Sequence, residues 1–127
     1  MKSTKLPEGV FELCLSWPPT VNHYWKGSGK HRYICAEGKA YRQEVCLRRP
    51  KGEMILTPVS VSILAHPPDR KRRDLDNILK CIMDSLAHAQ IYKDDFQVEE
   101  LHVYRREVRK PGCVKVTVKV LDVIPSK

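Results

Sequence analysis

The sequence predicts a single α+β domain, in which a mixed sheet of about four strands carries its helices mainly on one face. Two kinds of apolar periodicity lead to this expectation. Four segments show the pattern of strands, at 10–17, 56–65, 101–108 and 113–121. Two others repeat apolar residues at helical spacing, at 37–49 and 78–89. Because 127 residues suit one core, we expect one domain over 1–127, with 1–9 as an N-terminal extension.

The first strand is expected from Val10 to Trp17, where alternate residues are apolar. Its buried face would carry Phe11, Leu13, Leu15 and Trp17. Pro18 and Pro19 end the strand, because a proline has no N–H to donate to a ladder.

The next segment, 20–37, reads as a flexible basic loop of about 18 residues. Loops of this length in a small domain are usually functional or disordered. We expect its cations to contact phosphates; they are Lys26, Lys30 and Arg32. Its aromatic residues would either stack on unpaired bases or close the edge of the core; they are Tyr24, Trp25 and Tyr33.

The segment 37–49 predicts a basic amphipathic helix, with Ala40, Tyr41 and Val45 at helical spacing and Pro50 after its end. The segment 56–65 then alternates as a second strand. This strand leads directly into the most unusual stretch of the chain.

That stretch, His66 to Lys80, places a run of basic residues immediately before two carboxylates. The basic run is Arg70, Lys71, Arg72 and Arg73, and the carboxylates are Asp74 and Asp76. This combination suits a polyanionic ligand against which the carboxylates hold a metal ion. It indicates phosphodiester chemistry.

The helix that follows decides whether the two carboxylates can act together. Two residues apart within a helix, they would point to nearly opposite faces. If Asp74 is instead the N-cap, its side chain can turn toward Asp76. Lys80 then lies one turn beyond Asp76 and can approach a phosphate. The alternative is ordinary helix capping, with Lys80 as an i,i+4 partner of Asp76.

Two further acids, Asp94 and Asp95, follow in an expected turn. The helix spans about 18 Å, and the six residues that lead back to Asp95 cover about 20 Å when extended. A return to Asp74 in the same subunit is therefore barely feasible. Otherwise the turn reaches the site of a partner across a two-fold axis.

The last two strands are expected to form a hairpin, joined at residues 110–112. Basic side chains decorate it as a second basic surface; they are Arg105, Arg106, Arg109, Lys110, Lys115 and Lys119.

Composition narrows the class of protein. The formal net charge is +8 and the pI is near 9.4, which favours nucleic acid as a partner. No apolar run approaches a membrane span and no signal peptide is recognisable, so we expect a soluble, cytoplasmic protein. Five scattered cysteines without a Cys-x-x-Cys pair indicate reduced thiols. The spacing of His23, His31 and Cys35 fits no structural zinc pattern.

Three strings, SWPPTVNHYW, DRKRRDLDNILKCIMDSL and YKDD, closely resemble the RusA-like Holliday junction resolvases, small endonucleases of bacteria, their phages and prophages. The resemblance implies a RusA-like fold and a homodimer that binds four-way DNA junctions in recombination and repair. It also implies symmetrical paired cleavage that depends on Mg²⁺, for which Mn²⁺ can substitute. No small-molecule cofactor and no association with a membrane are expected.

The resemblance also assigns roles to residues. It implies catalytic, metal-binding carboxylates at Asp74, Asp76 and Asp95, with Lys80 at the scissile phosphate and Asp94 as a supporting acid. Asn77, Asn22 and Tyr24 also match the family and are expected to bind DNA. The other expected DNA-binding residues follow from their charge; they are Arg70, Lys71, Arg72, Arg73, Lys26, Lys30 and Arg32.

Two alternatives stay open from the residues alone. The chain could be a basic DNA-binding module without catalysis, in which Asp74 and Asp76 only cap a helix. It could also be a metal-dependent nuclease that acts on other branched or duplex DNA.

Overall fold

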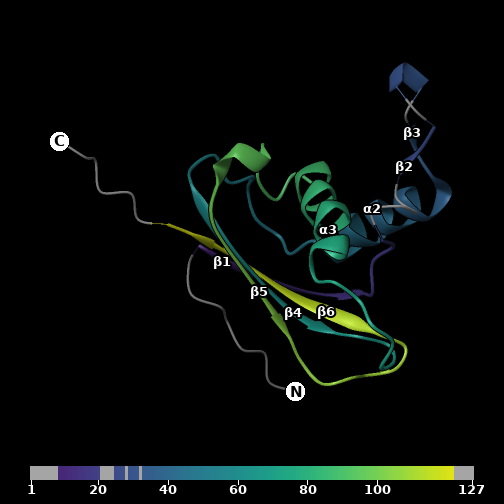
Figure 1. Ribbon diagram of the computed structural model, residues 1–127. Helices are drawn as coiled ribbons and strands as arrows, with labels where there is room; N and C mark the ends of the chain where they lie inside the picture. Colours follow the sequence, from purple (N-terminus) through teal and green to yellow (C-terminus); the bar gives the residue numbers. More distant parts are fainter. Residues whose placement is uncertain (1–8, 21–24, 28, 32, 122–127) are drawn as a thin grey trace.

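A four-stranded mixed sheet forms the body of the protein, and both helices cover the same face of it (Figure 1). The computed structural model describes residues 9–20, 25–27, 29–31 and 33–121. Its strands are β1 (Val10–Ser16), β2 (Trp25–Lys26), β3 (Tyr33–Ile34), β4 (Val59–His66), β5 (Val98–Arg105) and β6 (Cys113–Val120). Its helices are α2 (Ala36–Arg48) and α3 (Asp76–His88), with 3₁₀ turns η1 (Gly29–His31) and η2 (Asp95–Gln97). The predicted fold class is confirmed.

The strand order is β1-β6-β4-β5, so the expected hairpin between the last two strands is wrong. β4 lies between them, antiparallel to β6 and parallel to β5. In this inner place six of the eight residues of β4 are buried and the other two are half-buried. The edge strand β5 also begins three residues before its predicted start at Leu101, and most of its residues are exposed.

The core lies between the sheet and the helices. Ile78, Ile82 and Leu86 of α3 are buried against the sheet, as the helical periodicity predicts. From α2, Tyr41 and Val45 join the same core, whereas Ala40 is exposed. The hydroxyl of Tyr41 donates to the carbonyl oxygen of Ser16 at 2.8 Å, which fixes α2 to the end of β1.

Part of the predicted loop 20–37 is a small two-stranded hairpin, β2 paired with β3, which projects away from the sheet (Figure 1). Lys26 lies in β2 and Lys30 in η1, and both are exposed. Asn22, Tyr24 and Arg32 lie outside the described residues. Within the part of the chain that is described, no helix is both long and apolar enough to cross a membrane.

The packing of α3 predicts a large stability difference between two leucine truncations. Leu86 is fully buried and Leu47 of α2 is 82% exposed. Leu86→Ala should lower the free energy of unfolding by roughly 2–5 kcal/mol, because it leaves a cavity in the core. Leu47→Ala should change it by no more than about 0.5 kcal/mol. Urea denaturation of both variants checks this, and equal midpoints would contradict the packing.

Candidate active site

The segment between β4 and α3 is held to the segment between β5 and β6. The N–H of Arg109 donates to the carbonyl oxygen of Pro67 at 2.9 Å. The buried His66 ring places Nδ1 2.9 Å from the carbonyl oxygen of Glu107. Both segments leave the same end of the sheet, so their charged side chains come together there.

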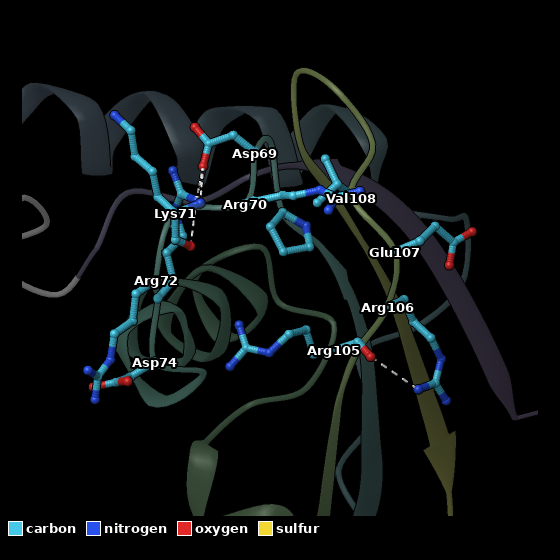
Figure 2. A pocket seen from close by; sticks show the side chains of 11 residues that line it. Asp69, Arg70, Lys71, Arg72, Asp74, Arg105, Arg106, Glu107 and Val108 are labelled. Carbon is cyan, nitrogen blue, oxygen red and sulfur yellow. Dashed lines mark hydrogen bonds and ion pairs between the residues drawn. The ribbon is translucent and has the colours of Figure 1, made fainter.

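Between these segments lies a cavity of about 660 Å³, which we call the basic groove. Six cations line it: Arg70, Lys71, Arg72, Arg73, Arg105 and Arg106. Figure 2 shows Lys71 and Arg72 on one side of the groove, and on the other side Arg105 and Arg106, which stand at the end of β5 and just after it. The basic run predicted from the sequence and part of the second basic surface therefore form one site.

Asp69 organises the basic run. Its Oδ1 accepts the N–H of Lys71 at 2.9 Å and pairs with the guanidinium of Arg73. The hydrogen bond from Arg73 is the main reason why the pKa of Asp69 is lowered to about 2. Arg73 in turn lies over the ring of Trp17, 6.0 Å from its centroid.

Asp74 lines the groove beside this run, but it is not the N-cap of α3. The N-cap is Leu75, whose backbone is already helical, and no side chain caps the helix. The carbonyl oxygen of Asp74 instead accepts the N–H of Asn77 at 3.1 Å. This short first turn places Asp74 just outside the helix and makes Asp76 its first residue.

The two carboxylates are both exposed, and neither has a hydrogen bond or ion pair with the described residues. Along α3, Lys80 and Asp84 follow Asp76 at intervals of four residues, so the three share one side of the helix. Asp84 is paired with Arg42 of α2 at 2.5 Å.

Asp95 returns to α3 within its own chain. It begins η2, and its charge interacts with those of Asp84 and Lys80. It therefore lies beside the middle of α3, beyond the first turn that carries Asp76. The chain therefore returns to α3 within one subunit and brings Asp95 near Lys80 and Asp84, whereas a return to Asp74 itself stays a prediction.

Tyr92, which the sequence analysis did not single out, holds Asp95 in this position. It is fully buried, and its hydroxyl oxygen lies 3.2 Å from Oδ1 of Asp95 and 3.3 Å from the carbonyl oxygen of Met83. Burial raises the pKa of the Asp95 carboxyl, and the hydrogen bond from Tyr92 partly opposes this. The only signal in the sequence was an aromatic residue three positions before the acid.

Asp94 has a local structural role. Its side chain accepts the N–H of Phe96 at 3.0 Å and forms a capping box with Gln97. The amide of Gln97 also donates to the carbonyl oxygens of Ile55 and Thr57, both at 2.9 Å. These bonds make η2 a well-held turn from which Asp95 projects.

Carboxylate oxygens suit a hard cation such as Mg²⁺, but the described part of the chain contains no preformed metal site. No three acidic, histidine or cysteine side chains among the described residues gather closely enough to hold a metal ion. Asp74 and Asp76 nevertheless offer free oxygen ligands. Magnesium is commonly held by one or two carboxylates, with water and substrate phosphate as its other ligands.

Several known endonucleases are similar in sequence to this chain. The Endodeoxyribonuclease RusA family matches residues 16–120. A protein of Enterobacteria phage 82 named crossover junction endodeoxyribonuclease RusA is 39% identical over 113 residues, which are 86% of this chain and 93% of the phage protein. The protein of the same name from Escherichia coli K12 is 38% identical with the same coverage. That of phage HK97 is 38% identical over 105 residues, 80% of this chain and 87% of its own length.

The family match spans three of the four strands of the main sheet, both helices, the basic groove and the acidic residues, and it begins at the last residue of β1. The chain belongs to the RusA endodeoxyribonuclease family.

Proposed function

We propose that this protein is a structure-selective endonuclease that resolves Holliday junctions by magnesium-dependent, symmetrical paired cleavage during DNA recombination and repair. Its relatives carry the name crossover junction endodeoxyribonuclease. The observation that carries the proposal is the position of Asp74 in the wall of a groove lined by six cations. Such a groove suits the phosphate backbone of DNA, and an acid at its edge suits hydrolysis of one phosphodiester.

In the proposed reaction, water attacks phosphorus and the bond from phosphorus to the 3′ oxygen breaks. The groove fixes the DNA strand by its phosphates, so that one phosphate meets the acidic residues. Lys80, one turn beyond Asp76, adds positive charge near this phosphate. Asp95, which Tyr92 holds near Lys80, adds a third carboxylate beside the polar side of α3.

Asp74 and Asp76 would hold the magnesium ion, with Asp95 joining them or acting through water. When bound, such a cation supplies Lewis-acid stabilisation of the charge that develops on the phosphate oxygens. Manganese prefers similar oxygen ligands and is expected to substitute.

The proposed enzyme works as a homodimer in the cytoplasm. A four-way junction has approximate two-fold symmetry, and its resolution requires two cuts in strands of like polarity. A two-fold dimer presents two equivalent sites to such a substrate.

Cleavage of a labelled four-way junction and of a linear duplex of matched sequence tests the proposal. Paired nicks in the junction alone, present with magnesium and absent with EDTA, are the expected result. Equal cutting of the duplex would favour a general metal-dependent nuclease. Tight junction binding without any cutting would favour a DNA-binding module.

The Asp76→Asn variant should lose junction cleavage by at least about a hundredfold, because it removes a metal ligand and a charge at the reacting phosphate. Junction binding should stay the same or become tighter, since a negative charge near DNA is removed. Gel-shift titration and single-turnover cleavage measure the two properties separately. Glu53→Gln is the matched control, because Glu53 is an exposed acid in the loop after α2, and it should behave as the wild type.

The basic groove predicts a specific change in salt dependence. Replacing Arg105 and Arg106 together by glutamine should weaken junction binding and lower the slope of log affinity against log salt, by roughly one for each phosphate that the variant no longer neutralises. Arg48→Gln is the control, because Arg48 lies on α2 and pairs with Glu44 at 3.4 Å. If both variants keep the wild-type slope, DNA does not lie in the groove.

A further inference from the structure

A second cavity, of about 310 Å³, adjoins the basic groove. The two cavities share three residues of their walls, Arg72, Arg73 and Asp74. Asp74 thus lies between the strongly cationic groove and a second cavity, whose remaining lining residues are uncharged. We call the second one the side pocket.

The wall of the side pocket that it does not share with the groove is uncharged, and it is part apolar and part polar. Trp17 and Ile78 supply its apolar surface, and Thr20 and Asn77 supply its polar part. The amide of Asn77 has no hydrogen bond with any residue that the structure describes. A primary amide both donates and accepts, so the pocket offers an aromatic residue and an apolar residue together with the unused amide of Asn77.

Trp17 is held firmly at this place. The guanidinium of Arg73 lies over its ring, and Arg73 is itself paired with Asp69. The turn before β6 also packs against it: a side chain at Gly112 would come within 2.9 Å of the Trp17 Cβ atom. Gly112 has a φ of +101°, a conformation that glycine adopts without strain. Trp17, which forms part of the pocket wall, is therefore held in place by contacts within its own chain.

These features match the parts of one nucleotide. A nucleobase is a flat ring with a polar edge, and it binds proteins by stacking on aromatic side chains and by hydrogen bonds from amides. Its phosphate requires cations. The wall that the two cavities share contains Asp74. It separates the side pocket, which suits the base, from the basic groove, which suits the phosphate backbone.

We propose that the side pocket receives a nucleobase next to the cleaved phosphodiester, and that Asn77 reads the edge of this base and so sets a sequence preference of cleavage. This inference rests on the proposed junction cleavage. It adds to that proposal the residues that choose where along the DNA the cut is made.

The first test maps cleavage sites on a set of junctions whose crossover nucleotides are varied. The Asn77→Ala variant should lower the ratio of cutting at the best and the worst site by about tenfold. Arg106→Gln should lower affinity for all of these junctions and leave the ratio unchanged. An equal loss at every site in Asn77→Ala would overturn the inference, because Asn77 would then only position another group.

The second test needs no cleavage, so it separates failure of this inference from failure of the proposed function. Junctions with 5-iodouracil at single positions around the crossover are bound to the Asp76→Asn protein, irradiated and analysed by mass spectrometry. A crosslink at Trp17 from one position is expected. It should weaken strongly in Trp17→Leu and persist in Trp17→Phe. Crosslinks confined to other residues would exclude the pocket, even if the protein never cuts DNA.

Discussion

The structure depends on the burial of β4 between β5 and β6. Six of the eight residues of this strand are buried and the other two are half-buried, which suits a strand with neighbours on both edges and helices on one face. The chain leaves β4 at the end where β5 also finishes and β6 begins. Two charged connections must therefore run side by side, and each is too polar to be buried. The basic groove and the exposed acids follow from that constraint.

A few buried or paired polar groups fix the positions of the side chains in the candidate site. Asp69 directs Arg73 onto Trp17, and Tyr92 places Asp95 beside α3. Neither Asp69 nor Tyr92 needs to touch DNA for this purpose. In the proposed mechanism they position the groups that contact DNA, because a site that handles a polyanion must hold its charges in place before the ligand arrives.

Local pattern predicted much of this fold, and non-local packing explains the rest. Apolar periodicity located the two helices and all four strands of the main sheet, and the composition indicated nucleic acid. Strand order could not be read, because adjacent segments with turn residues between them also suit a hairpin. The start of β5 was misplaced because an exposed edge strand keeps little alternation. The cap at Asp74 was wrong because Leu75 already adopts a helical backbone.

The sequence named candidate site residues but could not give their arrangement in space. The order of Asp74, Asp76, Lys80 and Asp95 carried the resemblance, yet the path of the chain after α3 depends on the burial of Tyr92, which no spacing reveals. From that path we infer that Asp95 works with Asp76 of its own chain.

Mixed dimers with two different affinity tags separate action within one chain from action across the dimer. We expect that a dimer of Asp76→Asn with Asp95→Asn cuts no strand of a junction, whereas a dimer of wild type with the double variant nicks one strand. The opposite pair of results, nicking by the first dimer and none by the second, would show that Asp95 serves the partner subunit and that the two acids of one chain do not form one site.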